Sequence, residues 1–282
     1  MEQMLIMDKI NLGIYEKALP NSLSIDDKLR IAKKIGFDQL EISIDESREK
    51  LSRLTNGFGK KLLKAQMENK LRVRTMCLSG HRKYPLGSMD ENIRKKSLEI
   101  MKKAIEFSDI NSIRIIQLAG YDVYYEKGNE DTKKYFIENL SKSVDMAAKY
   151  GVILAFETME TEFMDTVEKA MKYVKLIDSP YLGIYPDIGN LKNAAVKYGK
   201  DVVEDLKLGR GHIFAAHLKE TNPGIYRDMT FGSGGHTEYK RCIEELKDQG
   251  VRLYTGEFWD QGEENYEEIV RDSYEFLKDK LV

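Results

Sequence analysis

The chain has 282 residues, of which 41% are hydrophobic and 33% are charged, which suits one large α/β domain over residues 1–282. The formal net charge of −2 provides no basic surface field, which argues against nucleic acid as a partner. No apolar run approaches the roughly 20 residues of a membrane span, and two distant cysteines fit a reducing cytosol, so we expect a cytoplasmic protein without membrane association.

Strand-like apolar segments alternate with amphipathic helices from residue 10 onward. Capping residues mark some of the helix ends, as where Ser24 can begin a helix that Gly36 ends. The predicted strands are residues 10–15, 37–44, 71–78, 113–118, 152–156, 181–185, 212–216 and 251–256. The predicted helices are residues 24–36, 58–69, 89–110, 131–150, 163–177, 193–208, 238–249 and 265–281.

This alternation predicts parallel strands that are joined by right-handed crossovers. Such units in a chain of this length most simply close into an α/β fold of the (β/α)8 TIM barrel type, whose active site lies at the carboxyl ends of the strands. A doubly wound open sheet is the alternative. It would require a glycine-rich fingerprint after the first strand, and Gly13–Ala18 has none.

Four of the predicted strands deliver a metal-ligand side chain at their carboxyl ends. These residues are Glu157, Asp187, His217 and Glu257, on the last four strands. A single carboxylate after a strand is often only a helix cap, but the barrel brings these four side chains to one side of its mouth. Three carboxylates held this close require a cation. Mixed nitrogen and oxygen donors predict one divalent metal ion, with Zn²⁺ or Mn²⁺ favoured and Mg²⁺ or Co²⁺ as alternatives.

Several blocks of the sequence resemble those of a known family. They are Gly13–Pro20, Ser79–Ser88, Gln117–Tyr125, Tyr185–Asn190 and His217–Thr221. Together they are similar to the L-xylulose 5-phosphate (L-ribulose 5-phosphate) 3-epimerases of ascorbate and related pentose utilisation, xylose isomerase-like barrels with the older label of hexulose-6-phosphate isomerase. The resemblance runs from about residue 10 to the C-terminus. It implies metal ligands at the same four strand ends, a sugar phosphate as substrate, and a homodimer.

The implied reaction moves a proton at C3 of a 2-ketose from one face of the carbon to the other. The enediolate that forms needs a Lewis acid bridging O2 and O3, and an acid/base group on each face. We predict Glu157 and Glu257 as this catalytic pair. The assignment of each glutamate to one epimer stays open.

Substrate contacts are expected from loops that follow the first, third and seventh predicted strands. A phosphate group requires cationic and hydroxyl donors, which these loops supply. The predicted binding residues are Glu16, Lys17, Ser79, His81, Arg82, Lys219 and Arg227. Glu16 is expected either to accept a sugar hydroxyl or to pair with Lys17, and Trp259 is expected to wall the pocket.

Two other histidines carry weaker signals. His212 begins a strand, which places it at the bottom of the barrel in a structural role. His236 lies in a glycine-rich loop where the resembled family lacks a histidine, and Ser233 stands where that family usually has an acidic residue. We therefore discount His236 as a ligand, and the role of this loop stays open.

Other functions remain possible on the same fold. An aldose–ketose isomerase acting on a hexulose 6-phosphate would use the same metal and one of the same glutamates. A 3-epimerase of a non-phosphorylated ketose is disfavoured by the cationic loops. An endonuclease IV-like repair enzyme would need three metals, more than the four histidines present and a basic face. A barrel with only a binding or structural role would tolerate loss of ligands.

Overall fold

The strands form one eight-stranded parallel sheet in the order β6-β5-β4-β3-β2-β1-β8-β7. The computed structural model describes residues 10–282, so residues 1–9 of the predicted domain lie outside the described residues. The strands are β1 (Asn11–Tyr15), β2 (Gln39–Ser43), β3 (Arg72–Leu78), β4 (Ile115–Ala119), β5 (Ile153–Glu157), β6 (Leu182–Tyr185), β7 (Ala216–Leu218) and β8 (Leu253–Gly256). Isolated bridges link Ile184 to Ile213 and Asp187 to His217, which joins the two edges of the sheet. The predicted (β/α)8 barrel is confirmed.

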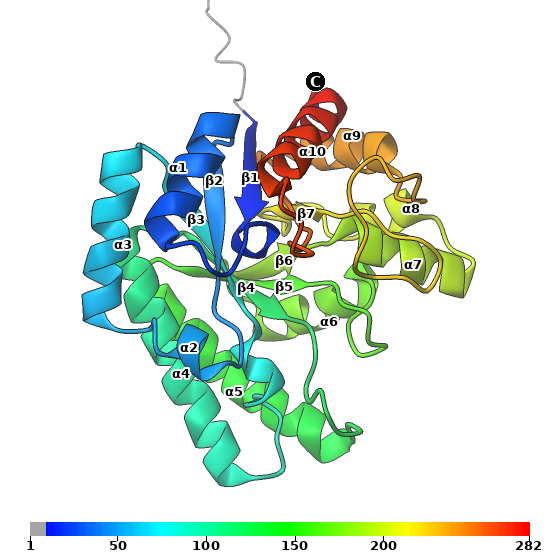
Figure 1. The fold of residues 1–282 in the computed structure, drawn as a ribbon. Helices are drawn as coiled ribbons and strands as arrows, with labels where there is room; N and C mark the ends of the chain where they lie inside the picture. Colours follow the sequence, from blue (N-terminus) through cyan, green and yellow to red (C-terminus); the bar gives the residue numbers. More distant parts are fainter. Residues whose placement is uncertain (1–9) are drawn as a thin grey trace, which may run out of the picture.

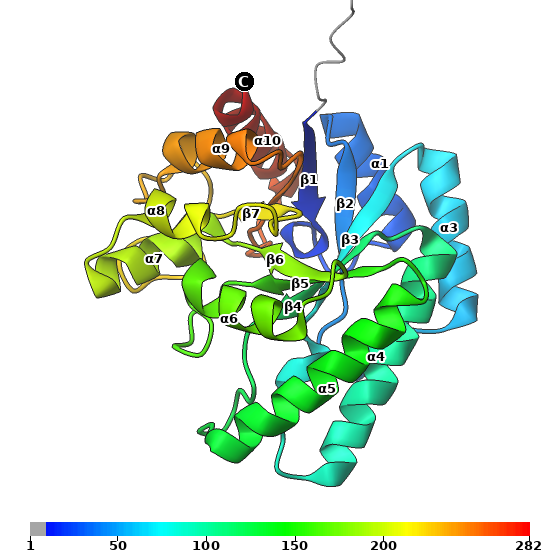
Figure 2. The same ribbon diagram turned by 180° about the vertical axis from the view of Figure 1, so that it is seen from behind.

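Helices surround the barrel on the outside, with α1 to α5 on one side and α6 to α10 on the other (Figures 1 and 2). They are α1 (Ile25–Ile35), α2 (Arg48–Leu51), α3 (Asn56–Asn69), α4 (Glu91–Asn111), α5 (Glu130–Ala148), α6 (Val167–Ile177), α7 (Ile188–Tyr198), α8 (Val202–Lys207), α9 (Tyr239–Asp248) and α10 (Tyr266–Leu281). Within residues 10–282, none of these helices is long and apolar enough to cross a membrane.

Side-chain caps explain where several helices begin. Ser24 accepts a hydrogen bond from the Asp27 amide at the start of α1, and Gly36, with φ of 125°, ends it as predicted. Asn129 forms a capping box with Thr132 at the start of α5. Such caps satisfy amide groups that have no partner within the helix, and thereby fix where each strand-to-helix loop ends.

The structure differs from the prediction in two places near the site. The single helix predicted over 193–208 is wrong, because Gly199, with φ of 62°, ends α7 before α8 begins. Helix α7 also begins earlier, at Ile188, because the Asp187 side chain caps it. The strand predicted over 212–216 is wrong in its bounds, since β7 covers Ala216–Leu218 and Ile213 makes only an isolated bridge.

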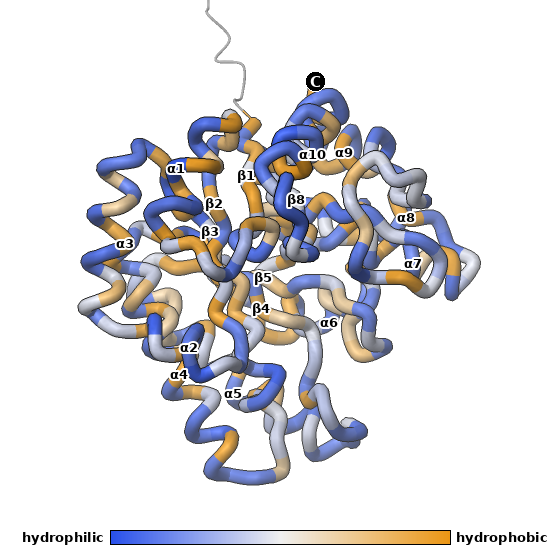
Figure 3. The backbone as a smooth tube through the Cα atoms, in the orientation of Figure 1, coloured by the Kyte–Doolittle hydropathy of each residue, from blue (hydrophilic) through white to orange (hydrophobic). Residues whose placement is uncertain are grey.

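The core has an apolar outer layer and a polar centre. Apolar side chains of the strands pack against the helices, whose solvent faces are hydrophilic (Figure 3). Inside the barrel, several polar side chains are fully buried, namely Gln39, Glu41, Thr75, Gln117 and Thr255. Burial of polar groups is costly unless they are hydrogen-bonded, so this layer must form a network beneath the mouth of the barrel.

Candidate metal centre

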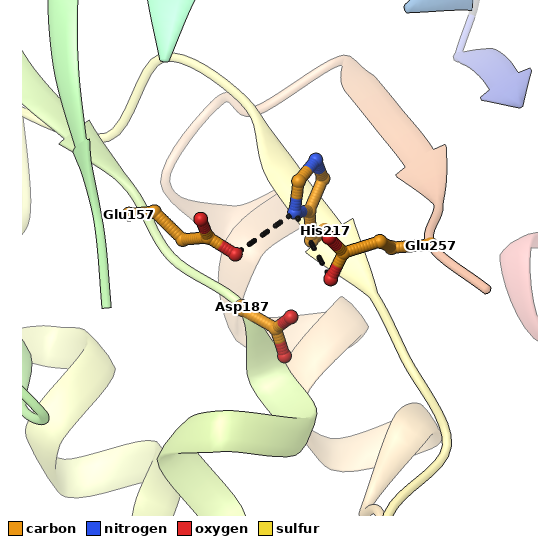
Figure 4. Close-up of side chains that lie close together, drawn as sticks. All are labelled: Glu157, Asp187, His217 and Glu257. Carbon is orange, nitrogen blue, oxygen red and sulfur yellow. Dashed lines mark hydrogen bonds and ion pairs between the residues drawn. The ribbon is translucent and has the colours of Figure 1, made fainter. Parts of the chain in front are cut away.

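Four side chains converge at the carboxyl ends of β5 to β8 (Figure 4). Glu157 is the last residue of β5, His217 lies within β7, and Asp187 and Glu257 follow β6 and β8. One ligand atom from each lies within 4.8 Å of those of the other three, and all four residues are buried. The structure therefore brings together the predicted metal ligands.

The backbone fixes these four positions relative to one another. The His217 amide donates to the carbonyl oxygen of Pro186 at 2.9 Å, and the Glu257 amide donates to that of Leu218 at 2.9 Å. The Asp187 amide donates to Thr158 Oγ1 at 3.1 Å. Each ligand thus lies on a strand end that is hydrogen-bonded to the next, which supports a fixed geometry.

Two buried oxygens in the cluster are incompletely balanced in charge. Asp187 uses Oδ1 to cap α7, so the cap and the proposed ligand role coexist, while Asp187 Oδ2 and Glu257 Oε2 are buried and share one cationic partner. Lys219 Nζ lies 3.3 Å and 2.9 Å from these two oxygens as an ion-pair partner. One lysine does not offset the charge of three carboxylates, and three carboxylate oxygens with one imidazole nitrogen are a donor set that suits a divalent ion.

The ionisation of the cluster is strongly perturbed. Burial, reinforced by Glu257, raises the pKa of Glu157. Burial also raises the pKa of Asp187 to about 7, although Lys219 opposes this shift. The pKa of Glu257 moves the other way, to about 2, because the attraction of Lys219 and His217 outweighs the effect of burial. The pKa values of the two predicted catalytic glutamates are therefore shifted in opposite directions.

His217 lies among three carboxylates, those of Glu41, Glu157 and Glu257. Burial alone would lower its pKa, but the charges of Glu41, Glu257 and Glu157 raise that pKa well above its usual value. The Glu41 carboxylate contacts the ring directly, with Oε1 2.7 Å from His217 Nε2. Glu41 is not among the site residues predicted from the sequence. Its one signal is a carboxylate between Leu40 and Ile42, in the middle of an otherwise apolar strand.

A polar pocket opens above the cluster. Among the predicted residues it includes Lys17, Ser79, Arg82, Glu157, Lys219, Arg227, Glu257 and Trp259. Lining residues that the sequence did not single out are Tyr15, Cys77, Ala119, Met159, Glu160, Asn190 and Tyr226. Three of them, Tyr15, Cys77 and Ala119, lie in the last two residues of a strand, and Met159 and Glu160 come shortly after β5. Their position at the carboxyl ends of strands is the signal that could have identified these five.

Two predicted substrate residues are not brought to this pocket. Glu16 is fully buried and its carboxylate accepts from the Ser43 amide at 2.8 Å and from Arg53 at 2.7 Å, with Lys50 also in contact. The predicted pairing of Glu16 with Lys17 is wrong, since Lys17 pairs with Asp45 at 2.6 Å.

His81 is also turned away from the pocket. Its Nε2 lies 3.2 Å from the carbonyl oxygen of Ser97, and burial lowers its pKa to about 4. A buried neutral imidazole adds no positive charge for a phosphate. The 3₁₀ turns that follow β1 (Glu16–Ala18) and β3 (Ser79–Arg82) decide these orientations, and the sequence pattern did not predict them.

The remaining residues of the loop after β7 lie outside the metal cluster. His236 Nε2 is 3.1 Å from Thr221 Oγ1, and its amide donates to the Thr221 carbonyl. Ser233 donates its hydroxyl proton to the carbonyl oxygen of Thr230. The aromatic face of Trp259 lies against two cations, Lys219 Nζ at 5.1 Å and Arg227 Cζ at 5.5 Å, so it does wall the pocket.

A parallel barrel with a buried His and carboxylate cluster at its carboxyl end is typical of barrel enzymes, and the cluster could hold a divalent ion. The family model for the xylose isomerase-like TIM barrel matches residues 29–280. The L-ribulose-5-phosphate 3-epimerase UlaE of Shigella boydii serotype 18 is 41% identical over 280 residues, covering 98% of this chain and 97% of that protein. UlaE of Salmonella heidelberg is 42% identical over the same coverage. The chain belongs to the xylose isomerase-like TIM barrel family and, within it, to the family of these 3-epimerases.

Solved structures of sugar epimerases share the fold. D-psicose 3-epimerase from Clostridium cellulolyticum H10, solved with D-tagatose, superposes with a TM-score of 0.79 at 16% identity, covering 96% of this chain and 99% of that one. An L-ribulose 3-epimerase gives a TM-score of 0.76 at 16% identity, covering 96% of this chain and 94% of that one. At these identities the likeness establishes the barrel.

Proposed function

We propose that the protein is a divalent-metal-dependent 3-epimerase that interconverts L-xylulose 5-phosphate and L-ribulose 5-phosphate. The observation that carries this proposal is the pair Glu157 and Glu257, which approach the cluster from opposite sides and both line the pocket (Figure 4). The name of the UlaE relatives, which are 41% identical over 98% of the chain, supports the choice of substrate.

Epimerisation requires an ionised base on one face of C3 and a protonated acid on the other. The two glutamates are placed to meet this need, since both line the pocket and approach the cluster from opposite sides, and their pKa values in the metal-free protein shift in opposite directions, that of Glu157 upward and that of Glu257 downward. Glu257 then accepts the proton of the epimer whose C3–H faces it, and Glu157 delivers a proton to the opposite face. The reverse reaction exchanges these roles.

The residues that would hold the ion are Glu157, Asp187, His217 and Glu257. A divalent ion supplies Lewis-acid polarisation of the ketose carbonyl, which acidifies the neighbouring C–H bond. Zn²⁺ or Mn²⁺ fits the mixed donors best, with Mg²⁺ or Co²⁺ as alternatives. Lys219, in contact with Asp187 and Glu257, keeps the excess negative charge of the cluster partly neutralised.

The phosphate group would be bound by donors of the loops after β1, β3 and β7. Arg82 carries a buried Nε with no hydrogen-bond partner, and its guanidinium lies 4.7 Å from the ring centre of Tyr124. A guanidinium held in place by an aromatic ring with a free N–H is suited to a phosphate oxygen. Ser79, Lys17 and Arg227 line the same pocket and add a hydroxyl and two cations.

Three further features are part of this proposal. The absence of a membrane-spanning helix within residues 10–282 is compatible with a cytoplasmic location. We propose a role in ascorbate or related pentose catabolism, on the basis of the family resemblance. The barrels of this family also lead us to propose a homodimer.

The test is proton exchange followed by NMR in D2O, with purified protein, an added divalent ion and L-ribulose 5-phosphate. We expect deuterium at C3 and growth of the second epimer, and loss of both in Glu157→Gln. Exchange at C1 instead would establish an aldose–ketose isomerase. Exchange on free ketoses but on no phosphorylated ketose would overturn the phosphate assignment.

A further inference from the structure

The carboxylate of Glu41 lies inside the barrel, beneath the metal cluster, and contacts one nitrogen of His217. Its Oε1 is 2.7 Å from His217 Nε2. The other ring nitrogen, Nδ1, faces the cluster, 3.4 Å from Glu157 Oε1 and 3.6 Å from Glu257 Oε2. The imidazole therefore bridges a buried carboxylate on one side and the candidate ligand set on the other.

Glu41 is itself held in place from two other strands. Its second oxygen, Oε2, accepts hydrogen bonds from the hydroxyls of Thr75 at 2.7 Å and Tyr185 at 2.9 Å. The Tyr185 hydroxyl lies 3.0 Å from Thr255 Oγ1, to which Gln39 also donates. The Tyr185 ring lies edge-on to the His217 ring, with 4.8 Å between centroids. This network crosses the barrel from β2 to β3, β6 and β8, and leaves the carboxylate little freedom to rotate.

We propose that Glu41 is a positioning residue that selects the tautomer and orientation of His217, so that Nε2–H donates to Glu41 and Nδ1 is the metal-binding nitrogen. A neutral imidazole carries one N–H, and the nitrogen that binds a metal is the one without it. Without Glu41, both tautomers and both ring orientations become accessible. This inference rests on the proposed divalent-ion site, but it concerns only the metal complex of the protein and involves no sugar.

The placement argues for a role beyond packing. Glu41 is fully buried among strands, where an apolar side chain would fill the same space without a desolvation cost. A matched comparison is Glu16, an equally buried carboxylate whose partners are Lys50, Arg53 and the Ser43 amide and none of the metal ligands. Removal of either carboxylate should lower the stability of the fold, but only removal of Glu41 should change the tautomer and orientation of His217.

The test measures metal affinity by competition with a chelator, and the His217 tautomer by long-range ¹H–¹⁵N NMR of the Zn²⁺-loaded protein. Only four histidines contribute signals, so a His217→Ala variant assigns the resonance. In the unaltered protein we expect Nε2 protonated and Nδ1 bound to zinc. We expect Glu41→Leu to weaken metal binding roughly 10- to 100-fold and to mix the tautomers.

Two further variants give the controls. Glu41→Gln should largely restore affinity, because its amide oxygen can still accept the Nε2–H bond. Glu16→Gln should leave the tautomer and the metal affinity unchanged, whatever it does to the melting temperature.

Zinc on Nε2 of the unaltered protein, or no detectable divalent-ion binding, would overturn the proposal, as would unchanged affinity and tautomer in a folded Glu41→Leu. If that variant does not fold, the nitrogen of His217 that binds zinc in the unaltered protein decides whether the proposal holds. Failure of epimerase activity with the expected tautomer present would refute the proposed function alone.

Discussion

Two groups of buried carboxylates lie near the carboxyl end of this barrel, and they differ in how far the protein satisfies them. Glu16 contacts Lys28, Lys50 and Arg53, and these cations lower its pKa despite its burial. In the candidate metal cluster, Asp187 and Glu157 have raised pKa values, and Asp187 and Glu257 share a single lysine, Lys219. The charge of Glu16 is balanced by protein cations alone, whereas the negative charge of the cluster is not fully balanced by protein groups.

This difference shows how a scaffold carboxylate can be distinguished from a functional one. Burial is common to both groups, so burial alone does not identify a site. The distinguishing feature is the balance of charge, because buried carboxylates with too few cations nearby have raised pKa values and favour the binding of an added cation. If this distinction holds, substitutions in the two groups should change stability and activity in different ways.

The largest effect is expected for Glu157→Gln. The substitution removes a proton-transfer group while keeping the shape of the side chain, so turnover should fall about 10²- to 10⁴-fold. The steady-state rate of epimerisation and the C3 exchange rate measure this. Glu162→Gln is the matched control, because Glu162 follows the same strand but is exposed and pairs with Lys197. Equal losses in the two variants would contradict the role of Glu157.

The second effect concerns the satisfied carboxylate. Glu16→Gln leaves the buried cations Lys28 and Lys50 without their counter-charge, and we expect a loss of about 3 to 5 kcal/mol in the free energy of unfolding. Urea denaturation at neutral pH measures it. The stabilisation that Glu16 provides should be present above its ordinary pKa and should be lost as the pH falls through its lowered folded-state pKa, because protonation removes the pairing. A variant as stable as the parent would remove the contrast between the two groups.

The sequence predicts only part of this difference between Glu16 and the metal cluster. The barrel and the convergence of the four side chains were predictable, because strand periodicity places each of Glu157, Asp187, His217 and Glu257 at a strand end. The partners of Glu16 and Glu41 were not, since those contacts join different strands and loops. Glu41 and His217 are 176 residues apart in the chain, and no local pattern encodes that pairing.

The orientation of His81 was not predictable for a related reason. It stands beside Arg82 in a cationic loop, yet the 3₁₀ turn sends His81 inward to Ser97 and Arg82 toward the pocket. Adjacent residues in a tight turn point in different directions, and only the turn geometry decides which one reaches the substrate. The same limit applies to Glu16 and Lys17 in the turn after β1.

A third, smaller effect is expected for the phosphate-binding residues. Arg82→Met should raise KM for the phosphorylated ketose roughly 10- to 100-fold, because a hydrogen bond to a charged group contributes about 1.5 to 3 kcal/mol. The values of kcat and KM for phosphorylated and free ketoses separate binding from chemistry. His81→Gln should leave KM close to that of the parent, since its ring faces Ser97. A larger effect at His81 than at Arg82 would reverse the assignment.

The smallest effect concerns Asp187, whose contribution to the pH dependence of stability has the opposite sign from that of Glu16. The pKa of Asp187 is raised to about 7, so the folded metal-free protein binds a proton there that the unfolded chain has already lost, and its stability should fall as the pH rises from about 4 through 7. Asp187→Asn removes this cost and keeps a helix cap of equal quality, so at pH 8 the metal-free variant should be more stable than the parent, on the order of 1 kcal/mol.

Added Zn²⁺ or Mn²⁺ should stabilise the parent by about 2.7 kcal/mol at 100 times its dissociation constant, and should not stabilise the Asp187→Asn variant. Thermal unfolding with and without metal, at pH 6 and pH 8, measures both terms. A metal-free variant that is less stable than the parent at pH 8 would show that protein groups alone balance the charge of Asp187, as they do for Glu16. That result would contradict the assignment of the cluster as a cation site.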